Sequence, residues 1–83
     1  PFSLEVHPNP AGDAVTVTIR GAESGRVELR LFNTLGRMVH STALTGASPA
    51  VAYAIPLHDL PPGMYVLRAD RKDASAFAVF LKR

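Results

Sequence analysis

The clearest structural signal in this chain lies at residues 14–33, which read AVTVTIR, then GAESG, then RVELRLFN. In both flanking runs, alternate residues are Val, Ile or Leu, and mostly polar residues stand between them. Successive side chains of a β-strand point to opposite faces of a sheet, so each run would present one apolar face. β-branched residues also favour strands. The segment therefore predicts two strands joined by a glycine-bounded turn.

Further strands of the same kind are expected on both sides of this segment. Val51, Tyr53 and Ile55 alternate with alanines, and other apolar runs precede and follow them. No stretch sustains the three-to-four-residue spacing of an apolar helix face. We expect seven strands, at about Ser3–His7, Ala14–Arg20, Arg26–Asn33, Arg37–Thr45, Ala50–Ile55, Gly63–Asp70 and Ser75–Lys82.

Seven short strands with turn residues between them indicate an all-β fold, a seven-stranded antiparallel β-sandwich of immunoglobulin-like architecture. Every second residue of such strands points into the space between the two sheets and fills the core. The residues expected to face inward are Val15, Val17, Ile19, Val27, Leu29, Leu31, Val51, Tyr53, Ile55, Leu60, Tyr65, Leu67, Val79 and Leu81.

Glycine and proline mark the connections between the expected strands. Asn33–Gly36 predicts a tight turn in which Gly36 adopts a positive φ. Gly21–Gly25 and Gly46–Pro49 predict loops, and Arg71–Asp73 predicts the tip of a hairpin.

The first proline-rich connection is Pro8-Asn9-Pro10. Each proline fixes its own φ and disfavours helix in the residue before it, so the segment should be rigid. We expect it to carry the chain from one sheet to the other. Asn9 is expected to close a local turn through its side chain.

The second proline-rich connection is a corner at Leu57–Gly63, which is followed by Tyr65. Immunoglobulin-like sandwiches often place a tyrosine near the start of a late strand, where its hydroxyl bonds back to an upstream backbone group. We expect the Tyr65 ring to fill the core while its hydroxyl makes such a bond. Gly63 should relieve the sharp approach to this strand.

The length and composition of the chain indicate one small domain. It has 83 residues, of which 47% are hydrophobic, and we expect residues 1–83 to be a single domain excised from a larger protein, because the chain starts at Pro1 without Met. It contains no cysteine, so no disulfide supports it. Nine basic and seven acidic residues are scattered along the sequence, which disfavours nucleic-acid binding. No apolar run approaches the ~20 residues of a membrane span, so no membrane insertion is expected.

The sequence shows no pattern typical of an active site. His7, His40 and His58 are far apart and lack the spacing of metal ligands. No serine lies in a GxSxG motif, and no glycine loop has the spacing that binds phosphates. We therefore expect no enzyme activity, no catalytic residue, no metal and no cofactor.

The final run, Ala74–Arg83, is apolar on both sides. Phe77, Val79 and Leu81 share one face, while Phe80 lies on the other face with two alanines. Two interpretations follow. In the first, the sandwich and a crossing loop cover both faces. In the second, one face stays exposed and marks a surface for a partner, and an edge strand can also pair with a strand of that partner.

Three patterns follow one another in a fixed order, at Pro8–Gly12, Leu35–Arg37 and Leu60–Tyr65, and the chain then closes on the basic residues Lys82 and Arg83. Together they resemble the type A C-terminal sorting domain of type IX secretion cargo, over essentially all of the chain. Each pattern is common alone, and the ordered set is fairly specific. One departure is that many members carry a lysine entering the final strand, where this chain has Ala74–Phe77. The matching residues are Pro8, Asn9, Pro10, Ala11 and Gly12, then Leu35, Gly36 and Arg37, then Leu60, Gly63 and Tyr65, and finally Lys82 and Arg83.

The resemblance implies a non-catalytic signal domain. It implies that a larger cargo protein crosses the inner membrane, folds in the periplasm and is recognised there by the outer-membrane translocon. A surface sortase then cleaves the domain off, and the cargo stays at the cell surface or becomes extracellular. The motif residues are expected to be structural. The residues expected to contact the translocon are Phe77, Val79, Phe80, Leu81, Lys82 and Arg83.

Two further hypotheses concern a homodimer and the class of protein to which the chain belongs. The terminal strand, with Phe80, could mediate a homodimer. The chain could instead be an immunoglobulin-like or fibronectin-like accessory module, for binding or spacing, of a secreted hydrolase or adhesin. It has no Trp, and Tyr53 and Tyr65 are both expected in the core, which disfavours glycan binding through exposed aromatic rings. Position in the precursor separates the classes, because a sorting domain must lie at the extreme C-terminus.

Overall fold

The computed structural model describes residues 2–21, 25–45 and 50–83, and the expected loops at 21–25 and 46–49 fall wholly or partly outside them. The described residues form an all-β fold of seven strands, with no helix. Their bounds agree with the expected ones to within one residue at each end. The strands are β1 (Ser3–His7), β2 (Ala14–Arg20), β3 (Arg26–Asn33), β4 (Met38–Thr45), β5 (Ala50–Pro56), β6 (Gly63–Arg71) and β7 (Ala74–Lys82).

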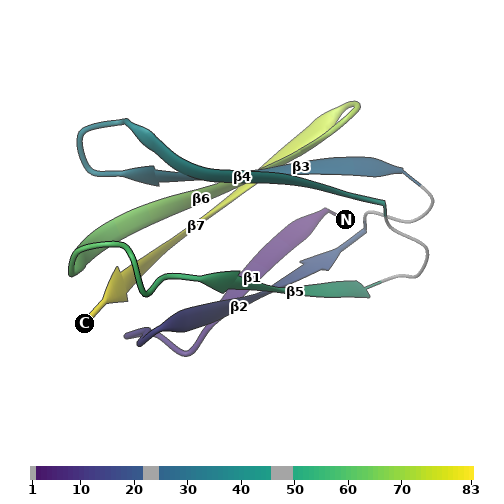
Figure 1. Cartoon of the computed structure of the whole chain (residues 1–83). Helices are drawn as coiled ribbons and strands as arrows, with labels where there is room; N and C mark the ends of the chain where they lie inside the picture. Colours follow the sequence, from purple (N-terminus) through teal and green to yellow (C-terminus); the bar gives the residue numbers. More distant parts are fainter. Residues whose placement is uncertain (1, 22–24, 46–49) are drawn as a thin grey trace.

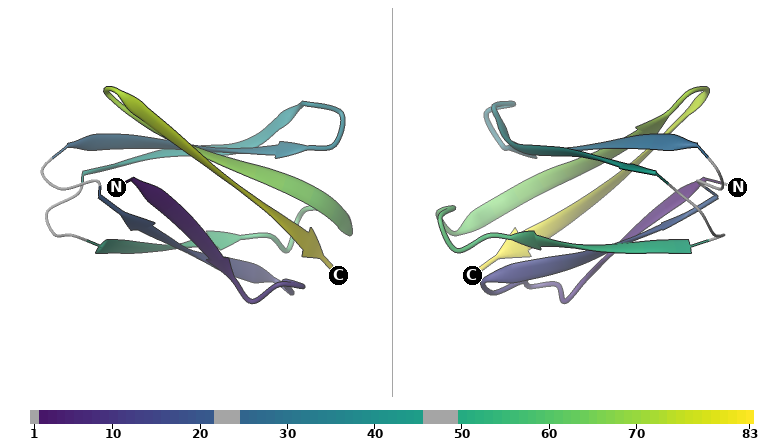
Figure 2. Two further views of the ribbon diagram at one scale, coloured as in Figure 1. Left: turned by 180° about the vertical axis from the view of Figure 1, so that it is seen from behind. Right: turned by 45° about the vertical axis from the view of Figure 1, so that its right-hand side comes forward.

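The strands form two antiparallel sheets that face each other as a β-sandwich (Figure 1). One sheet has the order β1-β2-β5 and the other has the order β4-β3-β6-β7. Figure 2 shows the two layers from behind and in an oblique view. In the constant-type immunoglobulin arrangement the fourth strand lies beside the fifth. Here β4 pairs with β3 instead, so the second sheet has four strands.

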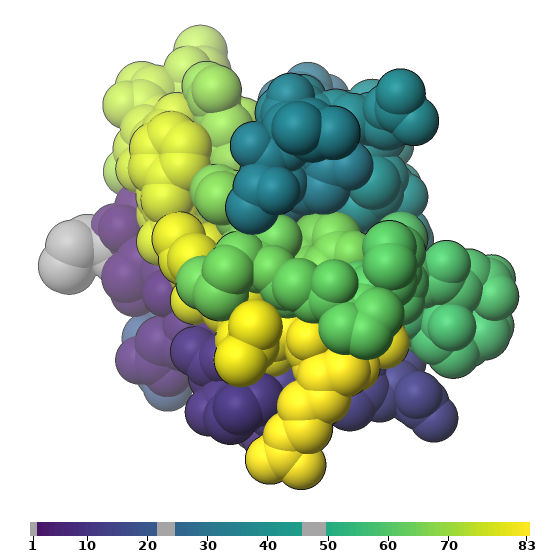
Figure 3. Space-filling view, turned by 90° about the vertical axis from the view of Figure 1, so that its left-hand side faces the viewer, coloured from purple at the N-terminus to yellow at the C-terminus, as the bar shows by residue number. Residues whose placement is uncertain are grey.

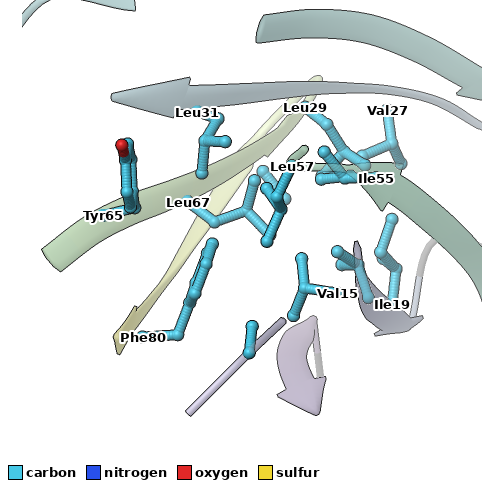
Figure 4. Close-up of a cluster of buried hydrophobic side chains, with 13 residues drawn as sticks. Val15, Ile19, Val27, Leu29, Leu31, Ile55, Leu57, Tyr65, Leu67 and Phe80 are labelled. Atoms are coloured by element: carbon cyan, nitrogen blue, oxygen red, sulfur yellow. The ribbon is translucent and has the colours of Figure 1, made fainter. Parts of the chain in front are cut away.

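The core lies between the sheets and is built from alternate residues of their strands (Figure 4). Nine of the residues expected inside are fully buried, while Tyr53 and Leu60 are half-buried and pack on them, and Val51 is half-buried. The sequence analysis missed the buried side chains of Ala11, Leu57 and Ala69. The nine are Val15, Val17, Ile19, Val27, Leu29, Leu31, Ile55, Tyr65 and Leu67.

The expected orientation of β7 was wrong. Val79 and Leu81 face outward, with 52% and 39% of their surface exposed, whereas Phe80 is fully buried. The Phe80 ring stacks on Tyr65, with centroids 5.9 Å apart and an angle of 24° between the planes (Figure 4). Because both faces of this strand are apolar, alternation alone did not show which one fills the core. The large ring beside Tyr65 is what selects the inner face.

The expected sheet crossover at Pro8-Asn9-Pro10 was also wrong. The segment connects β1 to β2, which are antiparallel neighbours in the same sheet. Both prolines follow cis peptide bonds. The chain first changes sheets between β2 and β3.

Two other connections agree with expectation. Gly36 has a φ of 82° in the turn between β3 and β4, and the side-chain oxygen of Asn33 accepts hydrogen bonds from the backbone N–H groups of Leu35 and Arg37 at 3.0 Å. The Tyr65 hydroxyl donates a hydrogen bond of 2.5 Å to the Pro61 carbonyl oxygen. Gly63, with a φ of 152°, opens the strand that carries this tyrosine.

Candidate functional site at the terminal strand

The outward face of β7 carries three exposed large apolar side chains in a row. Phe77, Val79 and Leu81 alternate along it, and Phe77 exposes 61% of its surface. Isolated exposed apolar residues are ordinary on proteins, but contiguous ones often mark a surface for a partner. The exposed face expected in the second interpretation is observed, and its use as a surface for a partner stays a prediction. Figure 3 shows β7, in yellow, at the molecular surface beside the purple N-terminal segment.

The register extends this surface across the four-stranded sheet. Val79 lies opposite Val66 of β6, Val66 lies opposite Phe32 of β3, and Phe32 lies opposite Met38 of β4. Met38 is half-exposed, and Val66 and Phe32 are half-buried. Beside this row, Leu81 pairs with Met64, which is also exposed.

We call these exposed and half-buried apolar residues of the four-stranded sheet the outer apolar surface. The sequence did not indicate its members outside β7, because only the pairing register shows that they lie side by side across the strands. The outer apolar surface comprises Phe77, Val79, Leu81, Met64, Val66, Phe32 and Met38.

A charged cluster borders the outer apolar surface toward the β6–β7 hairpin. The guanidinium group of Arg68 lies over the Phe77 ring, 5.6 Å from its centroid. Arg68 and Arg30 form ion pairs with Asp70 at 2.9 and 3.1 Å. The Ser75 hydroxyl donates a 2.5 Å hydrogen bond to the same carboxylate. This bond, aided by the two arginines, lowers the pKa of Asp70 against a smaller opposing effect of burial.

The structure divides the six residues that sequence analysis assigned to translocon contact. Phe77, Val79 and Leu81 are exposed, and so is Arg83 at the chain end. Phe80 is fully buried, and Lys82 exposes only 7% of its surface, with its ammonium group donating to the Arg83 carbonyl oxygen at 3.1 Å. The Phe80 ring is therefore covered in this structure, and a homodimer through the terminal strand stays a prediction.

The first sequence pattern lies against the end of β7. The backbone N–H of Leu81 donates to the side-chain oxygen of Asn9 at 3.0 Å. The N–H of Ala11 donates to the Leu81 carbonyl oxygen at 2.7 Å, and the N–H of Arg83 donates to the Ala11 carbonyl oxygen at 2.9 Å. Ala11 thus forms a parallel bridge to Lys82 and is fully buried. The loop between β1 and β2 fastens the two sheets together at this point.

The other two patterns are turn elements, as expected. Leu35, Gly36 and Arg37 form the exposed β3–β4 turn, two strands away from β7. Leu60 packs on the core, and the Tyr65 side chain of β6 is part of that core. The third pattern continues into β6, which pairs with β7 in the same sheet, whereas the first pattern reaches β7 from the opposite sheet.

Within residues 2–21, 25–45 and 50–83, no three His, Asp or Glu side chains gather closely enough to hold a metal ion. His58 lies 3.5 Å from Asp59, while the buried Nε2 atom of His40 has no hydrogen-bond partner among these residues. The same residues contain no helix that is long and apolar enough to cross a membrane.

The comparisons with known proteins agree with the ordered patterns. No curated protein matched the chain. The model of the secretion system C-terminal sorting domain matches residues 5–81, and so covers all seven strands except the first two residues of β1 and the last of β7. A sorting-signal family of this kind is non-catalytic, and its members belong to proteins exported by type IX secretion. With its β-sandwich and its ordered patterns, this chain belongs to the family of type IX secretion C-terminal sorting domains.

Proposed function

We propose that this domain carries its cargo to the outer-membrane translocon of type IX secretion and is removed afterwards by a surface sortase. The domain is non-catalytic in this scheme. It passes through the periplasm in a folded state, attached to its cargo, and the cargo ends at the cell surface or in the medium. Family membership supports the sorting role. The contact with the translocon and the cleavage are proposals.

The exposed face of β7 is the observation that carries the proposed contact. Phe77 and Val79 each leave more than half of their surface in water, although the fold buries comparable side chains elsewhere. Exposing apolar area costs a small domain both solubility and stability, so a functional reason is expected. A translocon component that covers the outer apolar surface would gain hydrophobic free energy on binding.

The buried residues of β7 have a different proposed role. The Phe80 side chain anchors the strand in the core by stacking on Tyr65. Lys82 lies inward beside the bridge to Ala11. These two residues keep the strand extended, so that its outward side chains form a rigid row. A truncation before Phe80 would therefore remove both the anchor and part of the row.

The proposal can be tested with a secretion assay. Residues 1–83 are fused to the C-terminus of a periplasm-exported fluorescent reporter in a type IX-competent strain. Three variants are compared with it: a truncation lacking Phe80–Arg83, the double substitution Phe77→Ser and Val79→Thr, and the control Leu35→Ser. Leu35 is a suitable control because 88% of its surface is exposed and it lies in the β3–β4 turn, outside the outer apolar surface.

We expect the intact fusion and the Leu35→Ser control to reach the surface or the medium, and to lose the domain as judged by mass. The truncation and the double variant should stay in the periplasm with the domain attached. Periplasmic retention of the intact, folded fusion would reject a sorting role in that host and favour an accessory module. Normal secretion of a folded double variant would reject the outward face of β7 as the contact.

A further inference from the structure

The loop that joins β1 to β2 does more than reverse the chain direction. Its residues Pro8–Gly12, here called the strap, reach out of their own sheet and bond to the last residues of the opposite sheet. Asn9 and Leu81 are separated by 72 positions in the sequence. Figure 3 shows the N-terminal segment, in purple, beside the end of the yellow strand.

The strap occupies the outer edge of β7 where that strand ends. The N–H and C=O of Leu81 both bond to the strap, so both point away from β6. The pairing of β7 with β6 stops at Lys82, opposite Gly63. The backbone N–H of Arg83 therefore depends on Ala11 for its hydrogen bond. Strand ends fray easily when their backbone groups lack partners.

Asn9 is chemically suited to this role. An asparagine in a turn commonly accepts a hydrogen bond from the backbone N–H two positions later. That group belongs to Ala11, and it donates instead to Leu81. The intervening Pro10 has no N–H to offer. The Asn9 side-chain oxygen is thus left to accept from the distant Leu81 N–H.

Ala11 suits its position for a steric reason. It is fully buried at the parallel bridge to Lys82, and both its backbone groups are engaged there. A small side chain lets the strap approach the edge of β7 closely. The neighbouring Gly12 has open space around the position that a Cβ would take, so the close contact is at Ala11.

We propose that Asn9 and Ala11 are positioning residues of the sorting signal. They hold Leu81–Arg83 in one extended conformation, so the element that the translocon recognises consists of the terminal strand together with the strap. The inference rests on the proposed function, and it makes the signal bipartite. A partner then meets an ordered end of β7 only when the strap is bound to it.

The first experiment measures order at the chain end, independently of secretion. Amide hydrogen exchange is recorded on the 83-residue chain and on Asn9→Ala. Loss of one hydrogen bond should speed exchange at Leu81 and Arg83 by roughly five- to tenfold, with little change in the middle of β3 or β6. Unchanged exchange at both amides would overturn the inference that the strap holds the end.

The control for this experiment is Asn33→Ala. The Asn33 side chain also accepts hydrogen bonds from the backbone, but it accepts two where Asn9 accepts one, and both lie in the β3–β4 turn. This variant should destabilise its own turn and leave exchange at Leu81 and Arg83 as it was. If Asn9→Ala does not fold, Asn9→Gln moves the amide oxygen outward by one methylene and tests the same bond.

The second experiment places the same variants in the reporter fusion. We expect Asn9→Ala to lower secretion several-fold, Asn9→Asp to restore it because a carboxylate accepts the same bond, and Asn33→Ala to leave it unchanged. Suppose that Asn9→Ala and Asn33→Ala have the same melting temperature and reduce secretion equally. Secretion would then depend on global stability alone, and this result would overturn the positioning role.

The intact fusion separates this inference from the proposed function. If the intact fusion stays in the periplasm, the sorting role fails in that host, and the exchange data still decide whether the strap orders the strand. If the intact fusion and a frayed Asn9→Ala fusion are secreted equally well, the sorting role stands and the bipartite signal is rejected.

Discussion

The two proline-rich connections of this domain differ in how far along the sequence their side-chain hydrogen bonds reach. In the corner before β6, the Tyr65 hydroxyl bonds to Pro61, four positions earlier. In the strap, the Asn9 side chain bonds to Leu81, 72 positions later. The corner stabilises its own strand, whereas the strap joins two sheets. Residue composition alone therefore does not tell a local connection from one that assembles the fold.

The largest expected effect belongs to the corner. Tyr65→Ala removes a ring that is 98% buried and stacked on Phe80, so the free energy of unfolding should fall by about 3–5 kcal/mol. Urea denaturation followed by circular dichroism measures this loss. A loss below about 1 kcal/mol would show that the corner is not a centre of stability.

A smaller effect is expected when only the hydroxyl is removed. Tyr65→Phe keeps the ring and loses the bond to Pro61, which should cost about 0.5–1.5 kcal/mol. Because Pro61 is exposed, water can satisfy its carbonyl group. The same denaturation assay measures the change, and secretion of the reporter fusion should stay normal. A secretion defect in this folded variant would show that the corner also contributes to recognition.

Asn9→Ala should cost a similar amount, about 0.5–1.5 kcal/mol, but in a different place. Its effect should concentrate at the end of β7, while that of Tyr65→Phe should spread through the global transition. Thermal unfolding monitored together with residue-level exchange separates the two. Uniform loosening of every strand in Asn9→Ala would remove the distinction between the strap and the corner.

The smallest effect concerns a third short-range contact, between Asp70 and Ser75 across the β6–β7 hairpin. The pKa of Asp70 is lower in the folded chain than in the unfolded one, chiefly through this bond. Its contribution to stability is therefore present above the unfolded pKa and is lost as the pH falls through the lowered folded pKa. Ser75→Ala should reduce this acid dependence. Equal slopes of stability against pH between about 2 and 4 in both proteins would contradict the assignment.

The seven strands and most of the core residues could be predicted from the sequence. Alternation in β2 and β3 has a polar face and an apolar face, so it specifies which side is buried. The Tyr65 bond was also predictable, because a local bond depends on nearby residues only. These are features that a few neighbouring positions determine.

Other features depend on distant pairing and could not be predicted. In β7 both faces are apolar, and only the stacking of Phe80 on Tyr65 decides between them. The outer row from Val79 to Met38 appears only when the register of four strands is known. A rigid proline segment fits a turn within one sheet as well as a crossover between two, so the sequence of the strap does not show which of them it forms. Nothing near Asn9 indicates that its partner is Leu81.

The bridge between Ala11 and Lys82 has a consequence for the order in which the domain can be completed. Because synthesis begins at the N-terminus, the strap is made long before β7. Its three hydrogen bonds cannot form until residues 81–83 are present. Closing so long a loop is slow compared with forming local hairpins. An incomplete chain would leave the inner faces of both sheets poorly joined at this edge. The bridge therefore joins the two sheets at this edge only after residues 81–83 have been made.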